Sequence, residues 1–171
     1  MNLRTLAASV ALLCAPAAFG EDADIAANPK LYASARCAKG EEVRVAKKDT
    51  LRCNFKAGSS DLADDPTCVV QLEPVLRALQ EEKSVKAMVL GFADAQGKAD
   101  KNKALSFQRA SAVRKYLIEG GVDAERFSVD GFGSDAAFFV CKEKTKDCDA
   151  QNRRIEIASY ICKKQKQRGK K

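Results

Sequence analysis

The sequence contains no histidine and no tryptophan among its 171 residues. Histidine is the side chain that most often serves as a general base and as a metal ligand. Its absence also excludes the Ser-His and Cys-His pairs that activate many nucleophiles. We therefore expect a protein that is not an enzyme and that holds no cofactor. The chain is long enough for one domain with a good hydrophobic core, and two such cores are not expected.

Long apolar runs are absent too. The clearest run, residues 6–13, is much shorter than the ~20 residues that span a bilayer, so we expect no transmembrane segment. It follows Arg4 and precedes small residues at the positions that a signal peptidase reads, which predicts a secretory signal peptide over residues 1–20. An acylated lipoprotein cysteine at Cys14 is the alternative, although the residue before it, Leu13, is not small. The predicted location is periplasmic or extracellular.

Positive charge is concentrated at one end of the chain. The net charge is +7, of which six charges lie in residues 163–171 and one is Arg4, so the rest of the chain is neutral. Such a run is typical of a disordered, solvated tail. It contains no aromatic side chains that would stack on bases, so we expect no nucleic-acid partner. Binding of the tail to anionic lipid stays open as an alternative.

Six cysteines remain once the predicted signal peptide is removed. An even number in an exported chain favours three disulfides, for which fifteen pairings are possible. A zinc site is disfavoured because the sequence has no CxxC spacing and no histidine. We expect Cys53 to pair with Cys68, and Cys37 to pair with Cys162 and so tie the N-terminal arm to the last strand.

Hydrophobic periodicity predicts one α/β domain over residues 49–162, preceded by an arm or linker over residues 21–48 and followed by the basic tail. The order βαβαββ predicts a sandwich in which a mixed sheet has helices packed on one face. The first helix either begins near Gln71 or is kinked at Pro74. The predicted strands are residues 49–55, 85–92, 126–132 and 153–161, and the second helix spans residues 102–119.

The second helix contains one anomalous residue. At about 100° per residue, Arg109 falls in the middle of the apolar stripe of this helix. A buried guanidinium needs a partner, because desolvating an unpaired charge costs several kcal/mol. Asp94 is the candidate, since it ends a central strand where open α/β sheets usually place ligand sites. The two side chains either form a plain ion pair or stand together at a cleft, where they grip an ammonium and a carboxylate.

Five separated blocks of the sequence resemble the OmpA-like C-terminal domain family. The resemblance covers residues 50–161, most of the mature chain. The blocks are Gly91-Phe92-Ala93-Asp94-Ala95-Gln96-Gly97, Asn102 with Leu105-Ser106 and Arg109-Ala110, Val113 with Tyr116-Leu117 and Gly120, Gly131-Phe132-Gly133, and Asn152-Arg153-Arg154-Ile155-Glu156-Ile157.

The resemblance implies non-covalent binding of peptidoglycan through the diaminopimelate of its stem peptide. In this family the aspartate that matches Asp94 holds the ligand's ammonium, and the arginine that matches Arg109 holds its carboxylate. Asn102 and Arg153 match positions at the rim of the site. Asn102 has the alternative role of a helix N-cap, and either Arg153 or Arg154 is expected to face solvent.

Two further features follow from the resemblance. The loop between Cys141 and Cys148 is similar to a disulfide loop found at this position in some members of the family. The family's His-Thr pair before the aspartate is replaced here by Phe92-Ala93, which implies weaker binding or a different ligand.

Two functions remain in competition at this point. The leading one is a periplasmic module that binds the cell wall and anchors an envelope or outer-membrane component to it. The alternative is a structural subunit that keeps the OmpA-like fold but binds a protein partner or anionic lipid, using its disulfides and its basic tail.

Overall fold

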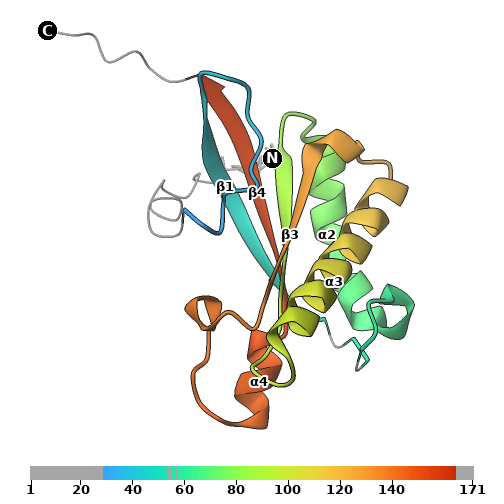
Figure 1. Ribbon diagram of the computed structural model, residues 1–171. Helices are drawn as coiled ribbons and strands as arrows, with labels where there is room; N and C mark the ends of the chain where they lie inside the picture. Colours follow the sequence, from blue (N-terminus) through green and yellow to red (C-terminus); the bar gives the residue numbers. More distant parts are fainter. Residues whose placement is uncertain (1–28, 54, 57, 165–171) are drawn as a thin grey trace, which may run out of the picture.

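The computed structural model of the protein describes residues 29–53, 55–56 and 58–164. The predicted signal peptide, Cys14 and residues 165–171 of the predicted tail lie outside this part of the chain. Four strands form one mixed sheet in the order β1-β4-β2-β3 (Figure 1). The strands are β1 (Glu41–Leu51), β2 (Lys86–Phe92), β3 (Phe127–Gly133) and β4 (Ile155–Lys164).

Two long helices, α2 (Pro66–Glu81) and α3 (Ala99–Glu119), lie on the same side of the sheet (Figure 1). Strands β2 and β3 are parallel because α3 forms the crossover between them, and β4 pairs antiparallel with both β1 and β2. A short helix, α4 (Lys146–Asn152), precedes β4. The predicted mixed sheet with helices on one face is confirmed, and α4 is an element that the predicted order did not include. No helix in the described ranges is long and apolar enough to cross a bilayer.

The first strand begins earlier in the chain than predicted. Residues 41–48, which the sequence placed in a linker, belong to β1, and the predicted strand over 49–55 overlaps only its last residues. The register of β1 against β4 shifts between Val45 and Lys47, and this irregularity breaks the alternation that normally identifies a strand. The predicted tail was also too long, because Lys163 and Lys164 pair with β1.

The sheet has a hydrophobic core on each face. One core lies between the sheet and the two long helices, and its fully buried strand residues include Val89, Ile155 and Ile157. The other is covered by residues 29–38, where Leu31 and Tyr32 are buried. The backbone N–H of Arg36 donates to the Tyr160 hydroxyl at 3.0 Å, and Lys86 donates to the Arg36 carbonyl at 2.9 Å. This part of the predicted arm is therefore packed on the domain.

Three disulfides cross-link the described part of the chain, and each pairing agrees with the expectation from the sequence. Cys37–Cys162 fastens the N-terminal segment to β4. Cys53–Cys68 joins the end of β1 to α2. Cys141–Cys148 closes the loop that leads into α4.

Helix α2 begins before the start that the sequence suggested. Pro66 occupies its first turn and the Asp65 side chain accepts a hydrogen bond from the Cys68 N–H at 3.2 Å, so this helix has an N-cap and an N-terminal proline. The alternative start near Gln71 is wrong, because Pro74 lies inside the helix on its exposed side.

Helix α3 packs unusually close to the sheet. A Cβ atom on Gly91 would lie 2.0 Å from the Ser106 carbonyl oxygen, and one on Gly131 would lie 2.5 Å from the Phe107 nitrogen. Only glycine fits at these two strand positions. The face of α3 that meets the sheet is therefore centred on small residues such as Ser106 and Ala110, and Arg109 lies at its edge rather than in its middle. This edge position brings Arg109 to a cavity.

Candidate functional site

Asp94 is held in place by the loop that connects β2 to α3. Its Oδ1 accepts a hydrogen bond from the Gln96 N–H at 2.8 Å. The Asn102 side chain donates to the carbonyls of Gln96 and Asp94, at 2.6 and 3.3 Å. Asn102 is therefore a brace for the loop. The alternative of an N-cap is wrong, because α3 begins at Ala99 and its N-cap position is Lys98.

Arg109 is 7% exposed and is held by backbone carbonyls. Its Nε donates to the Ser59 carbonyl at 3.0 Å and its Nη2 donates to the Lys56 carbonyl at 3.2 Å. The guanidinium also lies over the Phe55 ring, 5.0 Å from the centroid. No carboxylate of the described residues forms an ion pair with Arg109, so the alternative of a plain ion pair with Asp94 is not present.

The carboxylate of Asp94 pairs with Arg153 instead. The Arg153 Nη1 lies 2.5 Å from the Asp94 Oδ2, and Arg153 follows directly after α4. The two partners differ in exposure, since the Arg153 side chain is 42% exposed and that of Asp94 only 10%. The ion pair therefore joins a fixed carboxylate to an arginine at the rim that solvent reaches.

All four predicted ligand-binding residues line a single cavity of about 510 Å³. Asp94 and Asn102 come from the loop and first turns of α3, Arg109 from the middle of that helix, and Arg153 from the end of α4. Their charges sum to +1, with two guanidiniums and one carboxylate. The other lining residues are Phe55, Gly58, Ala93, Gln96 and Leu105.

Burial is the main cause that lowers the pKa of Arg109, and the nearby Arg153 guanidinium lowers it further, while Asp94 partly raises it. An arginine pKa starts so high that Arg109 stays protonated at neutral pH. The two guanidiniums repel each other across the cavity, and an anion between them would relieve that repulsion.

The loop that holds Arg109 has an ion pair of its own. Lys56 pairs with Asp64, and the Ser59 hydroxyl donates to the Asp64 carboxylate at 2.9 Å. Hydrogen bonds from Lys56 and then Ser59 lower the pKa of Asp64. The stabilisation that the ionised Asp64 gives the folded loop is fully present above the ordinary pKa of an aspartate. It is lost only as the pH falls through the lowered pKa of Asp64. The loop therefore keeps its anchor at neutral pH.

The residues that hold Arg109 in place could not be recognised from the sequence. Phe55 was assigned to a strand, and the Lys56 and Ser59 carbonyls are backbone acceptors that no residue type signals. Leu105 lines the cavity as well. The small residues Ser106 and Ala110 are the sequence signal for the face of α3 that packs on the sheet. If the buried face is centred on them, Leu105 and Arg109 fall at its edge.

The departure from the family pattern at Phe92-Ala93 affects two different places. Phe92 belongs to the core on the other face of the sheet, where its ring stacks on Phe132 at a centroid distance of 5.3 Å. The Arg154 guanidinium lies 3.9 Å from the Phe92 centroid. Ala93, in contrast, lines the cavity beside Asp94. Only the second substitution therefore changes the wall of the site.

The model of the OmpA family matches residues 54–154. This span contains the four predicted ligand-binding residues, Asp94, Asn102, Arg109 and Arg153. This chain belongs to the OmpA family. It is 36% identical over 104 residues to the probable lipoprotein YiaD of Escherichia coli strain K12, covering 61% of this chain and 47% of that protein. The outer membrane protein Omp38 of Acinetobacter baumannii is 33% identical over 106 residues, covering 61% of this chain and 29% of Omp38. This OmpA-family chain thus spans less than half the length of either relative.

Solved structures share the OmpA-like fold. The peptidoglycan-associated lipoprotein from Burkholderia pseudomallei superposes with a TM-score of 0.57 at 24% identity, covering 67% of this chain and 91% of that one. The C-terminal domain of Helicobacter pylori MotB gives a TM-score of 0.56 at 25% identity, covering 65% and 83%.

Proposed function

We propose that this OmpA-family chain is a non-enzymatic module that binds peptidoglycan non-covalently, through the diaminopimelate of the stem peptide. Another relative, 34% identical over 76 residues and covering 44% of each chain, is the peptidoglycan-associated lipoprotein of Mesorhizobium japonicum. The observation that carries the proposal is the juxtaposition of Asp94 and Arg109 on one cavity, without an ion pair between them. A fixed carboxylate and a fixed guanidinium are the complement of a zwitterion.

The free end of diaminopimelate carries an ammonium and a carboxylate on one carbon. The Asp94 Oδ2 is the acceptor for the ammonium, since Oδ1 is engaged by the loop backbone. The Arg109 Nη1 donates to no acceptor among the described residues, and it is the donor for the ligand carboxylate. Charge-assisted hydrogen bonds of this kind are the strong ones.

Arg153 changes its partner when the ligand binds. In the free protein it occupies the Asp94 Oδ2, the same atom that the ammonium needs. Its exposed side chain can turn to the ligand carboxylate, so that two guanidiniums share that anion and Asp94 is released to the ammonium. After the exchange each charged group lies beside an opposite charge, with the two guanidiniums sharing one carboxylate.

The proposed module works in the periplasm, where it anchors an envelope or outer-membrane component to the cell wall. The family membership and the three disulfides support an exported location, because disulfides persist in oxidising compartments. The protein partner in such an assembly would contact a surface other than the cavity.

A pull-down with purified sacculi that contain diaminopimelate tests the proposal. Asp94→Asn keeps an acceptor for the Gln96 N–H but loses the negative charge. Arg109→Lys keeps the positive charge but loses the planar guanidinium that can bind a carboxylate through two parallel hydrogen bonds. Each variant is expected to weaken retention by about tenfold or more, since hydrogen bonds to charged groups contribute ~1.5–3 kcal/mol.

Matched controls are Asp100→Asn and Arg77→Ala, which change exposed residues on α3 and α2. Circular dichroism checks that each variant is folded. Retention that is equal in the wild type, Asp94→Asn and Arg109→Lys would refute the proposed site. If deletion of residues 165–171 then abolished membrane or partner binding, the alternative of a structural subunit would be favoured.

A further inference from the structure

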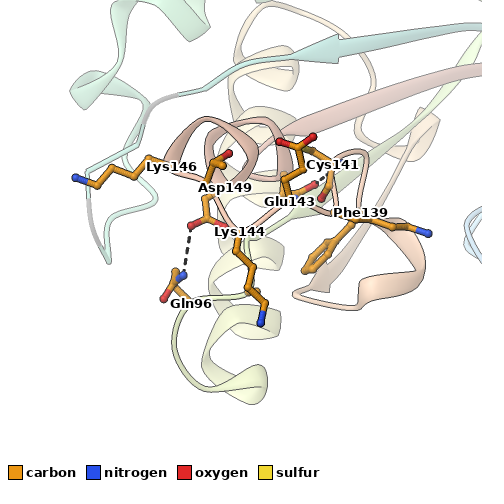
Figure 2. A pocket seen from close by; sticks show the side chains of 11 residues that line it. Gln96, Phe139, Cys141, Glu143, Lys144, Lys146 and Asp149 are labelled. Carbon is orange, nitrogen blue, oxygen red and sulfur yellow. Dashed lines mark hydrogen bonds between the residues drawn. The ribbon is translucent and has the colours of Figure 1, made fainter.

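A second cavity, of about 440 Å³, adjoins the candidate site (Figure 2). Gln96 lines both cavities, so the two share a wall. The second cavity is bounded on its other sides by the disulfide loop and by α4. Its lining includes Phe139 and the charged residues Lys142, Glu143, Lys144, Lys146 and Asp149.

The wall of this cavity is held rigidly. The Cys141–Cys148 disulfide closes the loop. Asn152 is 2% exposed, and its side chain accepts from the Val140 and Cys141 N–H groups, at 3.0 and 3.2 Å, and donates to the Cys141 carbonyl at 2.8 Å. Thr145 caps α4 by accepting from the Cys148 N–H at 3.2 Å. The loop therefore has its shape before any ligand arrives, which lowers the entropic cost of binding.

Positive charge dominates the cavity wall. Three lysines and two carboxylates line it, and the Asp149 carboxylate accepts a hydrogen bond from the Gln96 side chain at 3.3 Å. Lys142, Lys144 and Lys146 form no ion pair with any described residue. In Figure 2 the Lys144 side chain extends between Gln96 and Phe139, while Lys146 points away from them. Of the two lysines labelled there, Lys144 is the one that extends beside Gln96.

We propose that this second cavity is a carboxylate subsite for the same stem peptide whose diaminopimelate end lies in the first cavity. The inference rests on the proposed function. Each cavity carries a net charge of +1, while the free end of diaminopimelate is neutral, so the pair of cavities fits a ligand with further carboxylates. A peptide residue adjoining diaminopimelate brings such a carboxylate past Gln96 to Lys144.

Calorimetric titration with two ligands tests the subsite in the full mature chain. The ligands are free meso-diaminopimelate, which reaches only the first cavity, and a diaminopimelate-containing stem tetrapeptide with a free terminal carboxylate. The salt concentration is 150 mM, where charges farther apart than about 8 Å are screened. We expect Lys144→Glu to weaken the tetrapeptide about threefold to fivefold and to leave free diaminopimelate unchanged, as for an exposed ion pair. The triple variant Lys142→Glu, Lys144→Glu, Lys146→Glu is expected to bind the tetrapeptide about tenfold more weakly, or weaker still.

Lys83→Glu, an exposed charge reversal after α2, is the matched control and should change neither affinity. If Lys144→Glu lowers the affinity for both ligands equally, the effect is a long-range electrostatic one and the subsite is refuted. If it lowers the affinity for neither ligand, Lys144 does not bind the peptide. A tetrapeptide whose carboxylates outside diaminopimelate are amidated should bind with the affinity of free diaminopimelate. If the amidated tetrapeptide binds as tightly as the unmodified tetrapeptide, the inference is overturned.

The test separates the two proposals. Asp94→Asn should weaken both ligands. If Asp94→Asn changes neither affinity, or if the wild type binds neither ligand, the proposed function fails and the subsite fails with it. If Asp94→Asn weakens both while Lys144→Glu and the triple variant bind like the wild type, only the subsite is refuted.

Discussion

Two neighbouring arginines lie in opposite environments. Arg154 is buried on the sheet face away from α2 and α3, with its guanidinium over Phe92 and its Nε 2.7 Å from the Glu156 Oε1. Its Nη2 donates to the Phe138 carbonyl at 2.9 Å. Both side chains of this pair are 5% exposed. The pair is closed, because the ring, the carboxylate and the carbonyl surround the guanidinium.

Arg153 forms the open counterpart of this pair. Its partner Asp94 is fixed, but the arginine is half in solvent and both line a cavity. A closed pair has no room for a new partner and therefore contributes to the fold, whereas an open pair can exchange its partner for a ligand. The surroundings of an arginine and a carboxylate, rather than their identity, therefore decide whether the pair stabilises the fold or can bind a ligand.

The largest expected effect is on the closed pair. Glu156→Ala leaves the Arg154 charge buried without its carboxylate, so we expect the free energy of unfolding to fall by about 3–5 kcal/mol. Urea unfolding measures the change. Asp94→Asn removes the carboxylate of the open pair and should cost less than about 1 kcal/mol. Similar losses in the two variants would contradict the distinction between closed and open pairs.

A smaller effect is expected where the aromatic rings cover Arg154. Phe92→His restores the family's residue and should cost about 2 kcal/mol, because a smaller polar ring replaces one that stacks on Phe132 and on Arg154. Thermal unfolding measures the loss. Diaminopimelate affinity should stay at the wild-type value, since Phe92 does not line the cavity. An increase in affinity would show that position 92 reaches the ligand.

The smallest effect is on the wall of the open site. Ala93→Thr restores the family's hydroxyl beside Asp94, and one added hydrogen bond should tighten diaminopimelate binding by ~0.5–1.5 kcal/mol. Calorimetric titration measures the gain, and the unfolding free energy should change little. Ala93→Val, which has the same branched shape without the hydroxyl, is the matched control. An equal gain in that variant would assign the effect to packing.

Much of the helical and strand structure was predictable from local patterns. The spacing of apolar residues identified α3 and β2 to within a few residues, and the glycines after Glu119 marked the end of the long helix. Helix α4 was missed because its seven residues are mostly polar and carry no apolar period. The early start of β1 was missed because the register shift at Val45 breaks the alternation of that strand.

The candidate site was predictable in its members but not in its contacts. The residue blocks predicted that Asp94, Asn102, Arg109 and Arg153 belong together, and they line one cavity. The partner of Asp94 was not predictable, because Arg153 is 59 positions away and arrives through the packing of α4. The hydrogen bonds from Arg109 to the Ser59 and Lys56 carbonyls were not predictable either, since every residue has a backbone carbonyl.

Local patterns in the chain predicted an α/β fold, an even number of cysteines after the signal peptide, and Asp94 and Arg109 as partners, because periodicity and residue chemistry can be read without knowing the fold. The resemblance to the OmpA-like family added Asn102 and Arg153. The folded arrangement was needed to show which arginine pairs with Asp94, which pair is closed to solvent, and that a second cavity adjoins the first. Those outcomes depend on how closely α3 approaches the glycines of the sheet, and on a rigid disulfide loop that brings the end of α4 beside the β2–α3 loop.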